Sequence, residues 1–428
     1  MKNKFFLKDV SYLDSSTMQL KVGSIKIVDG IISEIEDVII DYGSDIIIEA
    51  QNIILMPGLV NAHLHPSKEI YGGALDASPI DIVLDTVHKN NALEDSEGQF
   101  IASLKSLTSG LMKGVTTYGV FTSRIQSDIR AIQQAGVRCV INYCQSNQWI
   151  GSGYSPENRA IDEIIQKYLE AEDQYQSELI KLSPATASEL SANEELLLSL
   201  HSIANKRMTN FTLHIHEGRH QVESYKNFYG QSAISNFDKM KLLDKNTTLI
   251  HCCTLSEEDI NILKRRDCNI VHCPVSNSFV GAGTMPIRPL WENRNIGLGT
   301  DAAMVNPNND LTFDAIFSLY HHGDSDFENK INAAEVIYML TEGGAKALGF
   351  KDIGKIEKGY KADFIFFNKD SIDVDYINTP VSLLKMLNRE KPNIVMINGV
   401  EVVKNNKLVN FNLSENNVSF SMIRERLA

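Results

Sequence analysis

Several residue types are scarce in this 428-residue sequence, and their scarcity excludes specialised classes of protein. The chain has 6 cysteines but no Cys-X-X-Cys pair, so the spacing indicates neither a zinc knuckle nor a redox dithiol, and we expect buried, reduced thiols. It has no uninterrupted run of about 18 apolar residues, the length that a transmembrane helix needs. Its basic start is not followed by an apolar stretch of signal-peptide length. We therefore expect a cytoplasmic protein with no membrane partner.

Positive charge is also in deficit. The sequence has 41 Lys and Arg against 54 Asp and Glu, which gives a formal net charge of -13. Nucleic acids and anionic membranes require clustered basic residues, so neither is an expected partner. A neutral or cationic small-molecule substrate fits this charge better. The length allows one large domain with a sizeable core and one smaller domain.

Both ends of the chain contain short apolar runs that are typical of β-strands. An Asp-Gly turn at residues 29–30 separates two of these runs, which indicates a hairpin, and an Asn-Gly pair at 398–399 interrupts the last run. We predict that residues 1–56 and 353–428 fold together as one small β-sandwich beside a domain of residues 57–352. The strand-like runs at the two ends are 5–7, 24–28, 31–35, 46–55, 362–367 and 393–403.

Eight strand-like runs alternate with helical patterns between these two ends. Near-continuously apolar strands that alternate with helices indicate a parallel sheet covered by helices, and eight such units predict a closed (β/α)8 TIM barrel. The competing fold is a doubly wound open sheet, which normally has a glycine-rich loop after its first strand, whereas here the first strand ends in His-Leu-His. The strands are predicted at 59–65, 115–121, 138–144, 179–184, 211–216, 247–252, 269–273 and 296–301, and helices at 128–135, 157–175, 192–206, 257–264 and 333–348.

Histidines and an aspartate fall at the ends of these predicted strands. In such barrels the carboxyl ends of the strands form the active-site face, so side chains there converge. A single histidine would more often pack in the core. Several strand-end residues at one barrel mouth favour a functional site instead. They are His63 and His65 in the first strand, His214 and His216 in the fifth, His251 in the sixth and Asp301 in the eighth.

His63 and His65 are separated by one residue, which places both imidazoles on the same face of a strand. Both can therefore reach one ion inside the barrel mouth. His214 and Asp301 complete a set of nitrogen and oxygen ligands that suits Zn2+, with Fe2+ or Mn2+ also tolerated. The sequence thus predicts a site for one divalent metal ion.

Six segments of the chain carry a further signal: MPGLVNAHLHP, LHIHEGRHQVE, LIHCCTLSEED, HCPVSNSFVGAG, GLGTDAAMVN and IGKIEKGYKADFIFF. In this order they resemble the signature segments of the amidohydrolase superfamily, and within it the mononuclear branch of cytosine, guanine and adenosylhomocysteine deaminases and s-triazine hydrolases. The resemblance extends from the first barrel strand nearly to the C-terminus. It implies a metal-dependent hydrolase of carbon–nitrogen bonds, in a family whose members are commonly homodimers or larger homo-oligomers.

The resemblance implies a role for each strand-end residue. His63 and His65, the first histidine of a His-X-X-Glu segment at His214, and the aspartate of Gly-Thr-Asp at Asp301 would be the metal ligands. His216 shares the strand parity of His214 and is the rival ligand, although the His-X-X-Glu spacing favours His214.

Glu217 and His251 would be the catalytic residues beside these ligands. By the same resemblance Glu217 would shuttle protons, and His251 would polarise the attacked group or stabilise its developing charge. A bound divalent ion lowers the pKa of its water toward about 7, so hydroxide becomes available at neutral pH. Asp301 would accept the proton of that water.

Ser276 and Asn277 follow the seventh strand, where the family places polar groups that face the substrate. Their alternative role is to stabilise a turn, and the two roles are equally supported. His272 lies inside the same strand and is expected to pack. Five histidines in helical or loop sequence are expected on the surface: His88, His201, His220, His321 and His322.

The metal count depends on the fourth strand. Binuclear relatives carry a bridging lysine or glutamate at its end, whereas Lys181 lies short of that end in this sequence. This position favours one metal ion. With two metal ions, His251 would become a ligand.

Two departures from the family pattern limit the choice of substrate. Residues 183–188 lack the histidine that many nucleoside-type deaminases carry, and residues 76–84 replace the usual Trp-Leu of the first long loop. Asp76, Asp81 and Asp85 could meet a cationic guanidine there, although solvated loop charge is favoured.

The sequence therefore predicts an aminohydrolase that deaminates a nitrogen-rich heterocycle or a guanidine-like compound. The same site would also serve dechlorination, removal of an alkylamine or opening of a cyclic amide, because only the leaving group differs. A non-catalytic scaffold is the alternative from another class. A scaffold would not need the complete set of ligands and acids.

Overall fold

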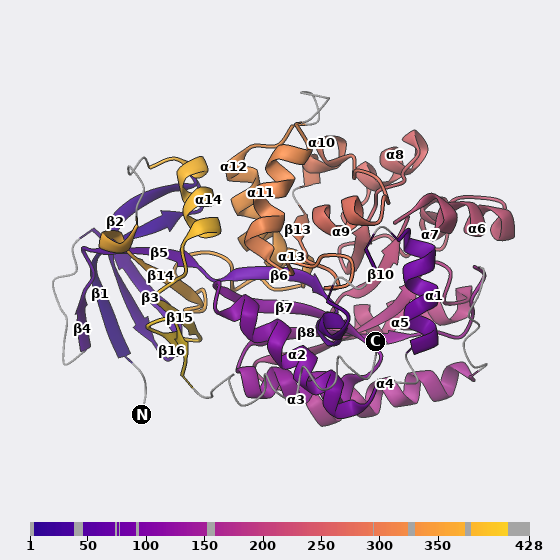
Figure 1. Ribbon diagram of the computed structural model, residues 1–428, viewed down its shortest axis with the longest axis horizontal. Coiled ribbons are helices and arrows are strands. Elements are labelled where there is room, and N and C mark those ends of the chain that lie inside the picture. Colours follow the sequence, from indigo (N-terminus) through magenta and orange to yellow (C-terminus); the bar gives the residue numbers. More distant parts are fainter. Residues whose placement is uncertain are drawn as a thin grey trace.

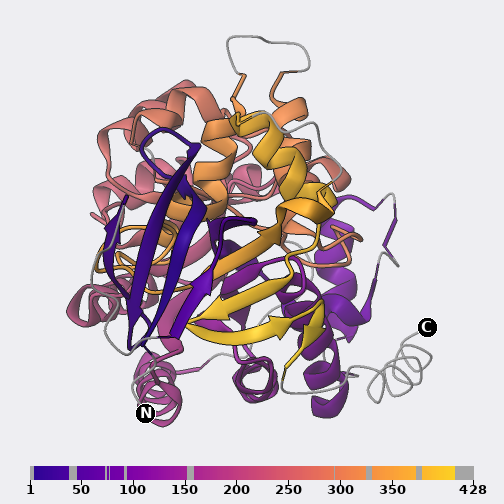
Figure 2. The same cartoon turned by 90° about the vertical axis from the view of Figure 1, so that its left-hand side faces the viewer.

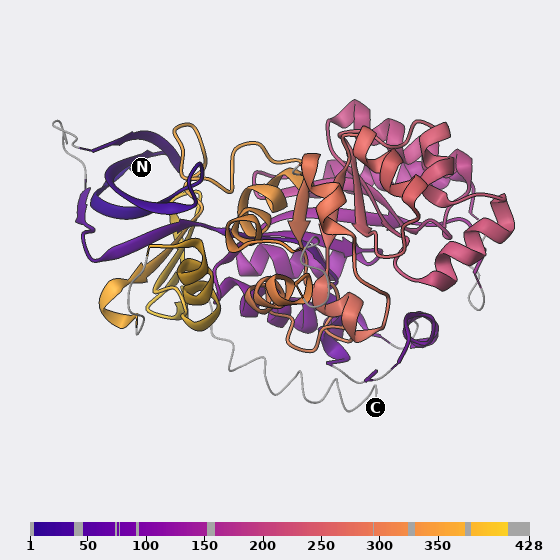
Figure 3. The same cartoon turned by 90° about the horizontal axis from the view of Figure 1, so that it is seen from above.

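The structure, a computed structural model, describes residues 4–37, 46–72, 75–76, 78–90, 94–151, 159–293, 295–323, 330–372 and 378–409. A sheet lies on the left of Figure 1, and a larger body of strands covered by helices lies on the right. Figure 3 shows the same two parts from above, with the sheet at one end of the larger body. Within the described ranges, no helix combines the length and the apolar character needed to cross a bilayer.

The two ends of the chain meet in one mixed sheet of nine strands. These strands are β1(Lys4–Asp14), β2(Gln19–Val28), β3(Ile31–Glu36), β4(Ile46–Glu49), β5(Ile53–Pro57), β14(Phe364–Asn368), β15(Ile394–Ile397), β16(Val400–Lys404) and β17(Lys407–Leu408). The junction is the antiparallel pair of β5 and β14, in which Pro57 faces Phe364. Figure 2 shows the indigo strands of the first segment beside the yellow strands of the last. The prediction that both ends fold together is confirmed.

A parallel sheet of eight strands forms the larger part. Its strands are β6(Leu59–Leu64), β7(Val115–Thr122), β8(Arg138–Gln145), β9(Ile180–Ser188), β10(Phe211–Ile215), β11(Thr247–His251), β12(Asn269–His272) and β13(Ile296–Leu298). They pair in sequence order, and a parallel bridge between Leu64 and Asp301 brings the first strand to the end of the last. The predicted (β/α)8 barrel is confirmed, whereas the domain boundaries 1–56, 57–352 and 353–428 stay predictions.

Helices surround this barrel, most of them on its outside (Figure 1). They are α1(Ile80–Asn90), α2(Ser96–Leu111), α3(Ile125–Ala135), α4(Ile161–Tyr175), α5(Glu194–Arg207), α6(Arg219–Tyr229), α7(Ala233–Lys239), α8(Glu257–Arg265), α9(Pro274–Phe279), α10(Ile287–Leu290), α11(Leu311–His321), α12(Ala333–Tyr338), α13(Gly344–Ala347) and α14(Pro380–Arg389), with short turns η1(Pro66–Ile70), η2(Trp291–Asn293), η4(Met339–Gly343) and η5(Lys369–Ser371).

Local signals in the sequence explain where individual helices begin and end. α8 begins after Ser256, whose side chain accepts the backbone N–H of Asp259, while the Asp259 side chain accepts the N–H of Ser256. Such a capping box satisfies two backbone donors that the start of a helix leaves unpaired. Gly136 ends α3 with φ of 67°, a left-handed conformation that glycine adopts without strain.

Small and branched side chains fill the inside of the barrel. Val60, Val140, Ile250 and Val271 come from four different strands and belong to one buried apolar cluster. Inward-facing residues of neighbouring strands pack in layers in such barrels, so the interior is a core and not a channel. The polar residues at the strand ends therefore lie above an apolar floor.

A buried ion pair joins the barrel to the sheet made by the chain ends. Arg138, the first residue of β8, donates from Nε to Asp363 Oδ2 over 2.9 Å and from Nη2 to Asp363 Oδ1 over 3.0 Å. The two side chains are 0% and 2% exposed. Nη2 also donates to Asn398 Oδ1, in the turn between β15 and β16. The sheet is thus fixed to the start of a barrel strand, at the end opposite the converging histidines.

We expect Arg138→Met to lower the free energy of unfolding by about 3–5 kcal/mol, because it leaves the Asp363 carboxylate buried without its partner. Lys89→Ala is the control, since its pair with Asp85 is exposed and such helix pairs contribute about 0.3–0.5 kcal/mol. Urea unfolding of the two variants measures the difference. Equal losses in both would contradict a structural role for the buried pair.

Candidate metal centre and active site

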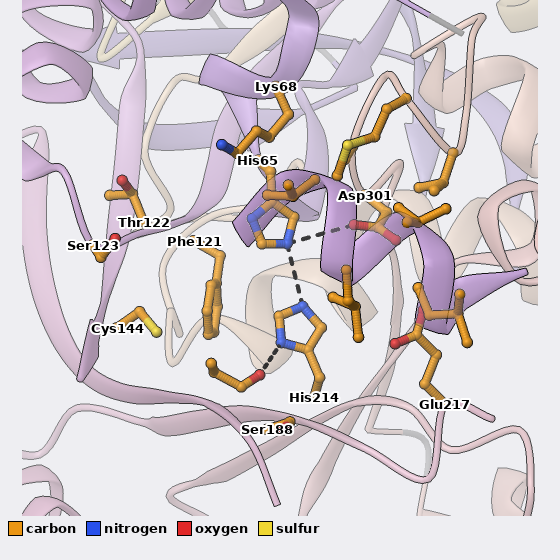
Figure 4. A pocket seen from close by; sticks show the side chains of 18 of the residues that line it. His65, Lys68, Phe121, Thr122, Ser123, Cys144, Ser188, His214, Glu217 and Asp301 are labelled. Atoms are coloured by element: carbon orange, nitrogen blue, oxygen red, sulfur yellow. Dashed lines mark hydrogen bonds and ion pairs between the residues drawn. The ribbon is translucent and has the colours of Figure 1, made fainter. Parts of the chain in front are cut away.

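The sequence-predicted ligands lie together at the mouth of the barrel. His63 is in β6 and His65 directly follows that strand, His214 is in β10, and Asp301 lies three residues after β13. One candidate ligand atom from each of the four residues lies within 4.8 Å of all the others. Figure 4 shows His65, His214 and Asp301 pointing toward one another across the cavity.

The distances between these atoms match the spacing of ligands around one small cation. His214 Nε2 is 3.1 Å from His63 Nε2 and 3.2 Å from His65 Nε2. Asp301 Oδ1 is 3.4 Å from His63 Nε2 and 3.5 Å from His65 Nε2. Ligands at zinc–nitrogen distances in tetrahedral geometry are about 3.3 Å apart. The donor set therefore fits a divalent ion such as zinc.

Neighbouring groups orient these donors. His214 Nδ1 lies 2.5 Å from the carbonyl oxygen of Ala187 and donates to it, so that Nε2 keeps its lone pair for a metal. Ser276 Oγ donates to Asp301 Oδ2 over 2.6 Å. A Cβ added at Gly299 would lie 2.8 Å from the Cβ of His63, so the absence of a side chain there lets His63 pack against the eighth strand.

Burial keeps the three imidazoles in the neutral form that binds metal. It lowers the pKa of His63 to about 4 and those of His65 and His214 to about 3. Desolvation is the largest cause for each, since it penalises the charged ring. At neutral pH, no proton has to leave these rings before a cation binds.

Glu217 and His251 lie in the same cavity as the four donors. His251 Nε2 is 3.7 Å from Glu217 Oε1, and His251 Nδ1 is 2.8 Å from Asn277 Oδ1, which accepts its proton. Burial raises the pKa of Glu217 to about 6, although nearby His251 acts in the opposite direction. A carboxyl group with that pKa can both accept and donate a proton near neutral pH.

The backbone is strained where these side chains are presented. His251 has φ of 79° and Asp301 has φ of 63°, in the left-handed region that residues other than glycine seldom adopt. Such conformations cost on the order of 1–3 kcal/mol and cluster at functional sites. The backbone N–H of Asp301 donates to the carbonyl of His63, and that of His65 donates to the carbonyl of Asp301, which holds the strained turn.

His216 and Lys181 lie outside this cluster. The His216 ring is buried with Nδ1 2.9 Å from the carbonyl oxygen of Thr254, so it faces away from the four donors. Lys181 Nζ lies 4.3 Å from the ring centroid of Phe350, near the start of β9. Glu217, His251 and Asp301 form a second group within 4.8 Å, so a single metal ion stays a prediction.

Ser276 and Asn277 are buried behind the site and are not among the residues that line the cavity. Ser276 hydrogen-bonds to Asp301, and Asn277 hydrogen-bonds to His251. The segment that follows β12 therefore supplies the hydrogen bonds that orient both residues. Substrate contact by these two residues stays a prediction. The structure supports a different task, which is to orient one ligand and one catalytic residue.

Two of the five histidines expected on the surface are buried, so that prediction was wrong for them. His201 is 7% exposed and packs from α5 near Asp244, and His322 is 2% exposed at the end of α11. The inner faces of these helices cover the barrel, which the sequence pattern around single histidines did not reveal. His322 Nε2 is 2.9 Å from that of His272, which is packed as predicted. His220 is exposed and His321 partly so, while the His88 side chain lies outside the described residues.

The cavity beside the donors has a volume of about 200 Å3 and has walls of different character. An apolar wall is formed by four residues of α1, Ile80, Val83, Leu84 and Val87, for which the sequence analysis made no prediction. The apolar residues at positions i, i+3 and i+4 of this segment were the available signal. Asp76, Asp81 and Asp85 are not among the lining residues.

Glu189 and the pair Lys68 and Arg124 also line the cavity and were missed. Glu189 Oε1 accepts the backbone N–H of His216 over 2.9 Å, and burial raises the pKa of its carboxyl to about 7. A buried glutamate in a loop after the fourth strand leaves no periodic signal in a single sequence.

Comparison with known proteins agrees with this geometry. The chain is 28% identical to a 5-methylthioadenosine/S-adenosylhomocysteine deaminase of Acetivibrio thermocellus over 424 aligned residues. The alignment covers 95% of this chain and 96% of that protein. An adenosine deaminase of Xanthomonas campestris with bound zinc has the same fold, with a TM-score of 0.87 at 20% identity over 99% of this chain and 98% of the other.

An atrazine chlorohydrolase of Arthrobacter aurescens TC1 complexed with zinc is similar in fold, with a TM-score of 0.87 at 19% identity over 98% of this chain and 100% of the other. The model of the amidohydrolase family matches residues 54–402. The predicted superfamily and the predicted hydrolase class are confirmed, and the chain belongs to the amidohydrolase family.

Proposed function

We propose that the protein is a metal-dependent aminohydrolase that removes ammonia from an amidine-like carbon of a nitrogen-rich heterocycle or a guanidine-like small molecule. The observation that carries this proposal is the convergence of four metal donors with Glu217 and His251 in one cavity. Deaminases among the relatives support it. A non-catalytic scaffold would have no use for this complete arrangement.

His63, His65, His214 and Asp301 would hold the ion, and three imidazoles with one carboxylate favour Zn2+ over Fe2+ or Mn2+. When bound, the ion supplies Lewis acidity that makes water a nucleophile at neutral pH. The neutral state of the three buried imidazoles and the hydrogen bond that fixes His214 support this assignment.

The chain's own groups supply the remaining chemistry. Asp301 accepts the proton of the attacking water through a carboxylate oxygen, while Ser276 holds the other oxygen. Protonated Glu217 donates its proton to a ring nitrogen as the water adds, and the proton held by Asp301 then passes to the departing amine. Glu217 regains a proton from the new hydroxyl group as the carbonyl forms, since its pKa of about 6 suits both directions. His251 would stabilise negative charge on the attacked group in its doubly protonated form, in which Asn277 holds Nδ1–H and the second proton lies on Nε2, 3.7 Å from Glu217 Oε1.

The metal assignment predicts that the purified protein binds one zinc ion per chain and that His65→Ala abolishes stoichiometric binding. Ser276→Ala is expected to lower zinc affinity by roughly 10–100-fold, because it frees the outer oxygen of Asp301. Elemental analysis and zinc titration measure both effects. His220→Ala is the control, since its side chain is exposed. Unchanged zinc content in His65→Ala would refute the ligand set.

Zinc is also expected to stabilise the fold. A hundredfold excess of free zinc over the dissociation constant adds about 2.7 kcal/mol of stability to a protein that binds it only when folded. Thermal unfolding of metal-stripped wild type and His65→Ala, each with and without zinc, measures this gain. The wild type alone should respond, and an equal shift in both would point to binding elsewhere.

The catalytic assignment predicts that Glu217→Gln lowers kcat for ammonia release by roughly 10²–10⁴-fold while zinc content stays unchanged. Glutamine keeps the shape of the side chain but cannot transfer the proton. Glu223→Gln, on the exposed side of α6, is the matched control. Ammonia should be assayed with purines, pyrimidines, pterins, triazines and guanidines on metal-loaded protein. Full activity of Glu217→Gln would remove the proposed proton shuttle.

The same site supports a second set of reactions in which chloride, an alkylamine or the nitrogen of a cyclic amide leaves. Attack on carbon is shared, so the residues alone do not separate these reactions from deamination. Product identification by mass spectrometry does, because each leaving group gives a different product. A small-molecule substrate fits every case, whereas the homo-oligomeric state and the cytoplasmic location stay predictions.

A further inference from the structure

A buried carboxylate organises two cations beside the metal donors. Glu94, whose side chain is 0% exposed, accepts bonds from Lys68 Nζ at 2.8 and 3.0 Å and from Arg124 Nη1 at 2.9 Å. It also accepts from Tyr71 Oη at 2.5 Å and from Gln99 Nε2 at 3.0 Å. These bonds occupy both of its oxygens, so Glu94 holds the cations in fixed places.

Both cations face the cavity, and Glu94 does not. Lys68 and Arg124 are lining residues with side chains 13% and 29% exposed, whereas Glu94 is absent from the lining. In Figure 4, Lys68, Thr122 and Ser123 lie on one side of His65 and His214, and Glu217 lies on the other. We call Lys68 and Arg124 the cationic wall.

Two of the described acids near the cationic wall, Glu94 and Asp128, lie behind it. Asp128 is completely buried, accepts hydrogen bonds from the hydroxyl groups of Ser103 and Thr122, and is not a lining residue. A molecule in the cavity therefore meets positive groups first on this side. This local charge is opposite to the net charge of -13, on which the expectation of a neutral or cationic substrate was based.

We propose that the cationic wall binds a carboxylate of the substrate. The inference rests on the proposed function and narrows it: the substrate is a heterocyclic or guanidine-like amine that also carries a carboxylate. The reacting carbon then lies between the metal donors and Glu217, the carboxylate lies against Lys68 and Arg124, and the apolar part packs on α1.

A carboxylate fits this wall better than a phosphate. The planar guanidinium of Arg124 and the ammonium of Lys68 are strong donors to either anion. Their charge is already shared with Glu94, so they match a monoanion more closely than a dianion. A substrate phosphate would need more positive charge than these two side chains provide.

Calorimetric titration of metal-loaded protein tests the inference without relying on turnover. The probes are an aminopyrimidine carboxylate and guanidinoacetate, each compared with its uncharged carboxamide and with the corresponding phosphonate. We expect the wild type to bind at least one carboxylate roughly tenfold more tightly than its carboxamide, which is the effect of one charge-assisted contact. Equal binding within every pair, no binding of either carboxylate, or a preference for the phosphonate would overturn it.

Variants distinguish carboxylate binding by the cationic wall from carboxylate binding by the metal ion, which also attracts anions. Lys68→Met and Arg124→Gln should each abolish the preference for the carboxylate, whereas Lys68→Arg, which keeps the charge, should retain it. Lys181→Met is the matched control, because it removes a half-buried cation at the other end of the barrel. A carboxylate preference that survives in Lys68→Met and Arg124→Gln would assign the anion to the metal and overturn the proposal.

Stability and turnover are recorded for every variant. Thermal unfolding shows whether loss of a cation beside Glu94 has disturbed the fold. If Lys68→Met does not fold, Lys68→Arg and Arg124→Gln still test the proposal, because Lys68→Arg keeps a cation beside Glu94. Carboxylate binding without ammonia release or any other hydrolysis product would refute the proposed function and leave the cationic wall in place. Ammonia release from the carboxamides at the same rate as from the carboxylates would refute carboxylate binding by the cationic wall and leave the proposed function in place.

Discussion

Mutual repulsion among closely spaced lone pairs is the constraint on which the site depends. Three imidazole nitrogens and a carboxylate oxygen lie within 4.8 Å of one another in a buried space, with four of their pairs 3.1 to 3.5 Å apart, an arrangement that suits a shared cation. The barrel supplies this geometry because parallel strands end at one face. Gly299, Ser276 and the strained turn at Asp301 then position individual donors.

The sequence was informative where a regular period connects residues to geometry. The two-residue repeat of a strand placed His63 and His65 on one face, and the strand ends brought His214 and Asp301 to the same mouth. The helical and strand periods also gave the eight barrel units. These features follow from local spacing and from one topological rule, whereas the choice of His214 over His216 came from the resemblance to the family's His-X-X-Glu segment.

Features that depend on contacts between distant segments could not be predicted in the same way. The bond between Lys68 and Glu94 joins η1 to a loop, and the apolar wall requires α1 to fold over the barrel mouth. The left-handed backbone at His251 and the burial of His322 likewise result from packing rather than from residue type. Ser276 and Asn277 show the same limit, because their position marked the site but did not reveal what they contact.

The sheet built from both chain ends has a consequence for how the protein is made. Asn52 and Asn368, which bond across the junction of β5 and β14, are 316 residues apart in the chain. At 5–20 residues per second, a ribosome needs roughly 15–60 seconds to synthesise the missing partner. During that interval the edge of β5 that later pairs with β14 has no partner, so the nascent chain exposes the edge of an apolar strand. Chaperones shield surfaces of this kind.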